Sequence, residues 1–130
     1  MEKILLDTNF LLLPAQFRID IFSELRRICD FNYRIFILDK SFDELNKIAE
    51  EQRGRRKAEV KLTLDILRLK INNNEVKVID TSDSDENVDD LIVSMDGYII
   101  GTQDRGLQQR LKQKNARIIS MRNQQYLFFK

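Results

Sequence analysis

The sequence predicts an α/β fold: one domain spanning residues 1–130, with three α/β/α layers around a mostly parallel sheet of about five strands. Short apolar runs alternate along the chain with longer segments of helical periodicity, the order typical of parallel sheets. The apolar runs are continuous instead of alternating with polar residues, as expected for strands that are covered on both faces. No linker or internal repeat divides the 130 residues.

The first 71 residues predict two strands and three helices. The first strand is the apolar run at 3–6, which ends at Asp7. The second is the sequence RIFIL at 34–38, which is rich in β-branched and aromatic residues. Apolar residues at helical spacing predict helices over 18–29, from Ser41 to about Glu51, and from Arg55 to about Ile71.

The remaining residues predict three strands and two helices. A polar, acidic segment at 81–87 is expected to be a loop. The tail at 125–130 is mixed, and its apolar part at 126–129 fits either a last edge strand or a dimer contact. The expected strands are EVKVID at 75–80, YIIGT at 98–102 and ARIISM at 116–121, and the expected helices are 88–95 and 104–114.

Two absences exclude most kinds of catalytic chemistry. The chain has no histidine, which excludes histidine triads, histidine acid–base pairs and nearly all transition-metal sites. Its single cysteine, Cys29, cannot build a zinc site, and one unpaired thiol fits a cytoplasmic protein. None of the four glycines lies in a phosphate-binding loop or a dinucleotide motif. An enzyme with this sequence must therefore use carboxylates, together with a metal ion that they hold.

Charge and hydropathy limit the partners. Lys and Arg number 22 and Asp and Glu 21, so the net charge of +1 does not by itself indicate a nucleic-acid module. No apolar stretch approaches the ~18 residues that a membrane helix needs, so we expect no membrane contact.

Five acidic residues lie next to the ends of predicted strands or at the starts of helices. Because the carboxyl ends of parallel strands meet at one edge of a sheet, such residues can converge there. Each also has a simpler interpretation: Ser41-x-x-Glu44 fits a capping box, and the others fit helix or turn caps. The five residues are Asp7, Glu44, Asp89, Asp90 and Asp104.

Convergence of these acids would have an electrostatic consequence. Two carboxylates ~5 Å apart repel by roughly 3 kcal/mol at an effective dielectric constant near 20. A cluster would take up protons or destabilise the fold unless a cation neutralised it, and oxygen ligands favour Mg²⁺ or Mn²⁺. Such a site hydrolyses phosphodiesters without histidine. The residues thus favour metal-dependent phosphodiester hydrolysis.

Three segments resemble the PIN-domain ribonucleases: LLDTN at 5–9, VDDLI at 88–92 and YIIGTQDRGL at 98–107. The pattern strand–Thr–x–Asp–Arg–x–Leu in the third segment is fairly specific, and the resemblance covers residues 3 to about 121. Within the family, the sequence is most similar to stand-alone archaeal proteins related to the eukaryotic small-subunit rRNA processing nuclease. The PIN-domain toxins of toxin–antitoxin pairs are more distant.

The resemblance implies a PIN-like fold, a Mg²⁺ or Mn²⁺ site and endonucleolytic cleavage of RNA, in rRNA processing or RNA turnover. A homodimer would be usual for the family, whereas nothing in the sequence indicates an antitoxin partner. Between the adjacent acids of the third position, Asp90 is favoured because the family's acid precedes an apolar residue, and Asp89 is a supporting metal-site residue. Carried over by position, the catalytic and metal-binding acids are Asp7, Glu44, Asp90 and Asp104, with Asn9 and Thr102 as supporting polar residues.

Two basic clusters are candidates for RNA binding, because Lys and Arg make most phosphate contacts. One surrounds Gly54 and the other follows Asp104. Both clusters also fit ordinary solvated helix surfaces. The candidate residues are Arg53, Arg55, Arg56, Lys57, Arg105 and Arg110.

Two further functions stay open from the sequence. The same fold could serve a non-catalytic RNA-binding or ribosome-assembly protein, whose RNA binding would be insensitive to EDTA. The chain could also be the toxin of a toxin–antitoxin pair, which a single sequence does not distinguish from rRNA processing or general RNA decay.

Overall fold

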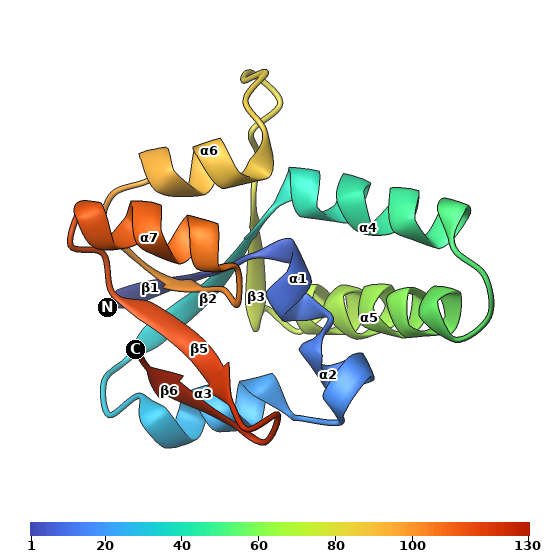
Figure 1. Ribbon diagram of the computed structural model, residues 1–130, viewed down its shortest axis with the longest axis horizontal. Coiled ribbons are helices and arrows are strands. Elements are labelled where there is room, and N and C mark those ends of the chain that lie inside the picture. The colour runs from blue at the N-terminus through green and yellow to red at the C-terminus, as the bar shows by residue number, and fades with distance from the viewer.

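The computed structural model describes residues 1–130 and contains one sheet of six strands in the order β3-β2-β1-β4-β5-β6 (Figure 1). Strands β1 to β5 run parallel to their neighbours, and β6 is antiparallel to β5. The strands are β1 (Glu2–Leu6), β2 (Tyr33–Leu38), β3 (Val76–Ile79), β4 (Tyr98–Gly101), β5 (Ile118–Arg122) and β6 (Tyr126–Phe129).

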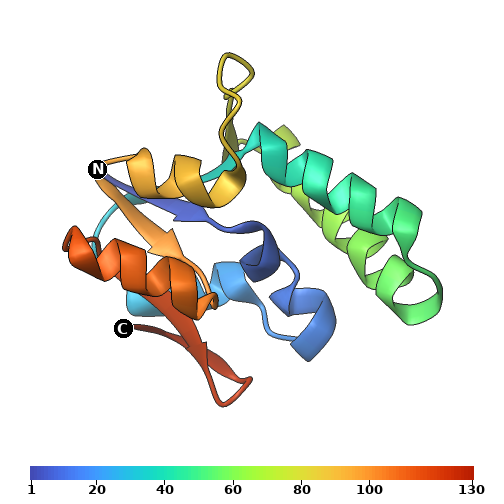
Figure 2. The same cartoon turned by 45° about the horizontal axis from the view of Figure 1, so that its top comes forward.

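Helices cover both faces of the sheet, which confirms the predicted three-layer α/β architecture (Figures 1 and 2). One apolar core contains side chains from α1 to α5, and a second, smaller core contains side chains from α6 and α7. None of the helices is both long and apolar enough to cross a membrane. The helices are α1 (Thr8–Leu11), α2 (Leu13–Phe17), α3 (Ile21–Ile28), α4 (Asp39–Glu51), α5 (Gly54–Asn72), α6 (Val88–Ser94) and α7 (Arg105–Gln113).

Strand β1 explains why the strands are continuous apolar runs. Ile4 and Leu6 pack into the larger core, and Leu5 packs into the smaller core on the opposite face. All three side chains are fully buried. Because successive side chains of a strand point to opposite faces, a central strand between two helical layers has no solvent-facing position to fill with a polar residue.

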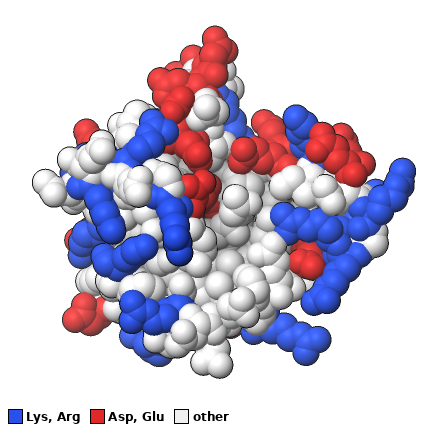
Figure 3. Space-filling model, viewed as in Figure 1, with Lys and Arg blue, Asp and Glu red and all other residues white.

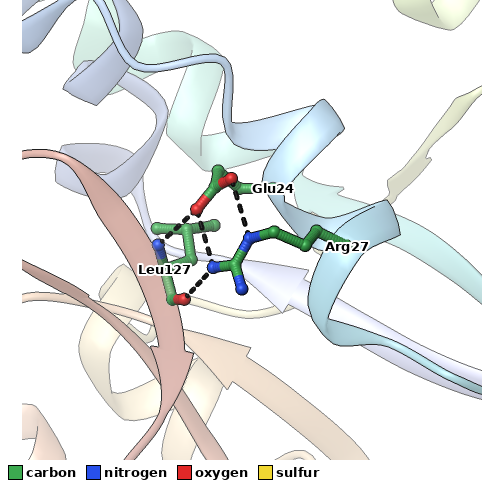
Figure 4. Close-up of polar contacts among 3 residues, drawn as sticks. All are labelled: Glu24, Arg27 and Leu127. Atoms are coloured by element: carbon green, nitrogen blue, oxygen red, sulfur yellow. Dashed lines mark hydrogen bonds and ion pairs between the residues drawn. The ribbon is translucent and has the colours of Figure 1, made fainter.

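The sheet has six strands instead of about five because the apolar tail forms β6 at its edge, which confirms the edge-strand interpretation of this segment. Its backbone is held by α3 as well as by β5 (Figure 4). Glu24 accepts a hydrogen bond from the Leu127 amide (2.9 Å), and Arg27 donates one to the Leu127 carbonyl (2.8 Å). Glu24 and Arg27 are also paired with each other. These partners lie about a hundred positions away in the sequence, so local pattern does not reveal them.

The start of the sheet's second crossover also differs from the prediction. Helix α4 begins at Asp39, two residues before Ser41, and its N-cap is Leu38, which makes no side-chain capping bond. Asp39 instead accepts hydrogen bonds from the backbone and hydroxyl of Thr81, which anchors the first turn to the loop after β3. Ser41 and Glu44 therefore lie inside the helix, and the capping-box interpretation is wrong.

Candidate active site

The strand order reverses between β1 and β4. The chain adds β2 and β3 on one side of β1, and β4, β5 and β6 follow on the other. In open α/β sheets, ligands bind outside the carboxyl ends of the strands at such a reversal. Leu6 and Gly101, the last residues of β1 and β4, are paired in register. Asp7 and Thr102, which come next, therefore lie side by side at the place where a site is expected.

Asp7 is buried at this edge, with 4% of its surface exposed. Its Oδ1 accepts a hydrogen bond from the Thr8 amide at 2.7 Å, and its Oδ2 accepts one from the Thr102 hydroxyl at 3.0 Å. The Thr102 hydroxyl oxygen in turn accepts a bond from the Asp104 amide at 3.1 Å. One threonine hydroxyl thus links the loops that carry the first and the last of the sequence-predicted acids.

The acids at this edge lie within one another's electrostatic field. Burial raises the pKa of Asp7 to about 6 despite the hydrogen bond from Thr102, and the charges of Asp89 and Glu44 contribute to the rise. Burial also raises the pKa of Asp89, with the charge of Asp104 as a further cause. The charges of Asp89 and Glu44 thus act on Asp7, and that of Asp104 acts on Asp89, although these acids lie up to 97 positions apart in the sequence.

Glu44 is positioned by two hydroxyl groups that the sequence analysis did not identify. The Thr8 hydroxyl donates to Glu44 Oε1 at 2.5 Å, and its oxygen lies 2.9 Å from the hydroxyl of Ser41. Thr8 and Ser41 are both buried, whereas Glu44 is exposed. The adjacency of Thr8 to Asp7 was the available signal, but Ser41 lies on another element and only the tertiary structure brings it here.

Asp104 caps a helix and faces the site at once. It is the N-cap of α7, where its Oδ1 accepts a bond from the Leu107 amide at 3.0 Å. The predicted capping role is therefore confirmed, and it does not occupy the whole carboxylate, because Oδ2 has no partner. Glu44 is similar: its Oε1 is held by Thr8, and its Oε2 has no partner. Each exposed acid is fixed through one oxygen and leaves the other available.

The two adjacent acids of α6 have different surroundings. Asp90 forms an ion pair with Arg110 at 2.9 Å, and both side chains are about half exposed. Asp89 contributes to the raised pKa of Asp7 and is itself affected by Asp104. Asp89 therefore lies in the electrostatic field of Asp7 and Asp104, whereas Asp90 is paired with Arg110.

The donor set suits a hard cation. No three side chains of acidic, histidine or cysteine type lie close enough together to surround one metal ion. Mg²⁺, however, usually keeps several waters and binds only one or two carboxylates, together with phosphate oxygens of its substrate. The site offers only oxygen atoms, which Mg²⁺ and Mn²⁺ prefer, and two of its carboxylates have a free oxygen.

Basic side chains flank this acidic edge on two sides (Figure 3). One group lies at the turn between α4 and α5, where Arg53 is the N-cap of α5 and Arg55 pairs with Glu59 at 3.4 Å. Arg56 and Lys57 follow in the first turn of α5. The other group lies on α7, where Arg105 is exposed at the first turn. Both predicted basic clusters therefore lie on the elements that follow acidic residues of the site.

Comparison with known proteins places this arrangement in a family. The sequence matches the family of PIN-like domains over residues 4–124. It is 27% identical over 128 residues to a protein of Methanocaldococcus jannaschii named Ribonuclease VapC4, covering 97% of this chain and 95% of the relative.

Two solved structures share the fold. The PIN domain endonuclease Utp24 superposes with a TM-score of 0.74 at 22% identity, covering 98% of this chain and 90% of its own. A domain of a functionally unknown protein from Methanocaldococcus jannaschii superposes with a TM-score of 0.63 at 16% identity, covering 94% and 92%.

Proposed function

The chain belongs to the family of PIN-like domains, and on that premise we propose that it is an endoribonuclease that depends on a divalent cation. The observation that carries the proposal is Asp7: a carboxylate buried at the point where the strand order reverses, with its pKa raised to about 6 by burial and, to a smaller extent, by the charges of Asp89 and Glu44. Burial of an ionised acid beside like charges is costly to the fold. A cation bound beside Asp7 would offset this cost.

The residues of the chain would prepare this site before substrate arrives. The Thr8 amide and the Thr102 hydroxyl orient the two oxygens of Asp7, and Thr8 also orients Glu44. Partners of this kind fix the direction of metal-binding carboxylates and commonly affect metal affinity and activity. A bound Mg²⁺ or Mn²⁺ would act as a Lewis acid. It would stabilise negative charge on the phosphodiester and lower the pKa of the attacking water.

We assign Asp7, Glu44, Asp89 and Asp104 as the residues that would hold the cation. Asp89 takes the place of Asp90 in this set because it is the residue of α6 whose charge acts on Asp7. Asp90 would act through its ion pair with Arg110, holding that guanidinium on α7. Asn9, exposed on α1, would lie on the substrate side of Asp7.

The basic groups support RNA as the substrate. The clusters at the α4–α5 turn and on α7 lie on either side of the acids, so a phosphate backbone crossing the site could contact both (Figure 3). The relative named a ribonuclease and the fold shared with the endonuclease Utp24 point to the same class of reaction. We propose a role in rRNA processing or RNA turnover for this activity.

The test is cleavage of an end-labelled RNA by the wild type beside Asp7→Asn, each with Mn²⁺, with Mg²⁺ and with EDTA. We expect internal cleavage by the wild type only when metal is present, and loss of at least about 100-fold in the variant. Cleavage that persists in Asp7→Asn would contradict the site. RNA binding without cleavage, unaffected by EDTA, would favour the non-catalytic alternative.

A further inference from the structure

A groove of about 460 Å³ opens beside the acidic edge, between α1 and α2 on one side and the β5–β6 turn on the other. Two of its lining residues adjoin the site in the chain: Asn9 lies two positions after Asp7, and Gln103 lies between Thr102 and Asp104. Figure 3 shows uncharged surface in this part of the molecule, with basic side chains to either side. A ligand held at the carboxylates would therefore extend naturally into the groove.

The lining of the groove is unusual for a chain in which a third of the residues are charged. None of its eight residues is charged, and five carry a side-chain amide: Asn9, Gln16, Gln103, Asn123 and Gln124. An amide offers both a donor and an acceptor, which is the combination that the edge of a nucleobase requires, whereas phosphates are bound mainly by Lys and Arg. The groove thus suits the base, and not the backbone, of a nucleic acid.

An aromatic ring and two further apolar side chains complete the lining. Phe17, at the end of α2, is 37% exposed, one of the few large apolar side chains that the fold leaves open to solvent. Aromatic rings of this kind stack on unpaired bases in RNA-binding proteins. Leu13 and Met121 form apolar parts of the same walls. Stacking on a ring, with amides around the base edge, is the usual combination in recognition of single-stranded RNA.

One of the amides is fixed in advance. The Oε1 atom of Gln103 accepts bonds from the Ser120 hydroxyl at 2.6 Å and from the Met121 amide at 2.5 Å. Its Nε2 atom also donates to the Met121 carbonyl at 3.4 Å, so the side chain is held against β5 before any ligand binds. Its oxygen is occupied by these bonds, and one N–H remains to meet a ligand without an ordering cost. In the chain, Gln103 lies between Asp104 and Thr102, and the Thr102 hydroxyl connects Asp7 to the Asp104 amide.

Two residues of the turn at the far side of the groove have a positive φ, a backbone conformation that favours glycine, and both carry a side-chain amide. Asn123 and Gln124 have φ angles of 57° and 55° and are the central residues of a β-turn, which is closed by the bond from the Gln125 amide to the Arg122 carbonyl. Turns of this type prefer Asn followed by Gly, and a glutamine in this conformation is strained. Strain of this kind is common where a side chain serves binding.

We propose that this groove is a nucleobase-binding site, in which an unpaired base adjoining the scissile phosphate stacks on Phe17 and contacts the surrounding amides. The inference rests on the proposed function, because it takes the substrate to be RNA whose backbone crosses the acidic edge. It adds a specificity-determining element: the site selects RNA that presents an unstacked base next to the cleaved bond.

The experiment measures RNA binding and not cleavage, so that a failure of the nucleobase site can be distinguished from a failure of the proposed nuclease activity. Fluorescence anisotropy in EDTA compares 10-nucleotide RNAs of A, U or C with an oligomer of 1′,2′-dideoxyribose phosphate of equal length and charge. We expect the wild type to bind the best of the base-bearing strands at least about tenfold more tightly than the baseless strand, as for loss of one base–aromatic stack. Phe17→Ala and Gln124→Gly should each reduce that ratio and leave the affinity for the baseless strand unchanged.

Gln125→Ala is the matched control, because Gln125 is an exposed neighbour of Gln124 that does not line the groove. It should keep the full preference. Gln124→Gly should also raise the melting temperature, since glycine relieves the strained φ, so lost preference cannot be ascribed to unfolding.

Equal affinity for base-bearing and baseless strands, or a preference that survives both groove variants, would overturn the nucleobase site. Absence of binding to every strand would overturn it together with RNA as the substrate. A base preference in a protein that never cleaves RNA would support the groove and contradict only the nuclease.

Discussion

Two carboxylates in this molecule have similar hydrogen bonding and opposite electrostatics. Glu24 accepts bonds from Arg27 and the Leu127 amide, and Asp7 accepts bonds from Thr102 and the Thr8 amide. The bond from Arg27 holds the pKa of Glu24 below its usual value, whereas burial raises the pKa of Asp7 to about 6. The ionised form of Glu24 thus stabilises the contact between α3 and β6, whereas the fold disfavours the ionised form of Asp7.

The difference lies in the neighbours. Glu24 has a cation beside it in the same helix, so its negative charge is compensated within the fold (Figure 4). Asp7 has other carboxylates around it, and the basic residues nearby lie on the flanks, where Arg110 is already paired with Asp90. The comparison teaches that the charge of Glu24 is compensated by a cation of the same helix, whereas the charge of Asp7 has no compensating cation among the groups that set its pKa.

The largest expected effect is a difference in the rate of RNA cleavage between variants of the two acids of α6. Asp89→Asn should lower metal-dependent RNA cleavage by at least about 100-fold, because its charge belongs to the cation site. Asp90→Asn removes an exposed ion pair and should change the rate by less than about fivefold. Initial rates at saturating Mn²⁺ measure both. The reverse order would assign the site to Asp90 and remove Asp89 from it.

Stability should depend on pH through Asp7. Its pKa is about 6 in the folded protein and about 3.8 when unperturbed, so the folded state binds more protons between these values. Stability therefore falls as the pH rises from about 4 to 6, by roughly 3 kcal/mol at 1.36 kcal/mol per unit of pKa. Without metal, Asp7→Asn should recover up to about that amount at pH 7.5 and nothing at pH 4. Urea unfolding of both proteins at the two pH values measures this difference. A variant less stable than the wild type at pH 7.5 would show that Asp7 only caps a turn.

The opposite sign is expected for Glu24. Glu24→Ala leaves the amide of the fully buried Leu127 without its acceptor, which should lower the free energy of unfolding by about 2 kcal/mol. Glu50→Ala is the matched control, since Glu50 is exposed on α4 and makes no polar contact, and it should change stability by less than about 0.5 kcal/mol. Equal effects of the two changes in urea unfolding would show that the α3–β6 contact contributes nothing.

The sequence predicted the layers, a mostly parallel sheet and the edge at which the acids meet, because these follow from local apolar runs and from general rules of α/β topology. It left β6 as one of two interpretations of the apolar tail, because the partners that hold this strand, Glu24 and Arg27, are distant in the chain. The helices α1 and α2 were missed, since each is only four or five residues long and has too few turns to show a period.

Within the site, the limits of prediction have a physical cause. Asp7 and Asp104 could be located because each directly follows a strand or starts the next helix. Asp89 and Asp90 could not be distinguished, because neighbours on a short helix differ only by the direction of their side chains, which the packing of α6 against α7 decides. Thr8 and Ser41 are ordinary residues until β1 and α4 are packed together.

The central claim is that the carboxylates at this edge await a cation, and thermal unfolding with and without Mg²⁺ tests it most directly. A ligand that binds only the folded protein raises its stability by an amount that grows with the ratio of ligand concentration to Kd, about 2.7 kcal/mol at 100 times Kd. At pH 7.5 we predict a clear rise in the melting temperature of the wild type with Mg²⁺, and almost none in Asp7→Asn. The same rise in both proteins, or no rise in the wild type, would contradict the account.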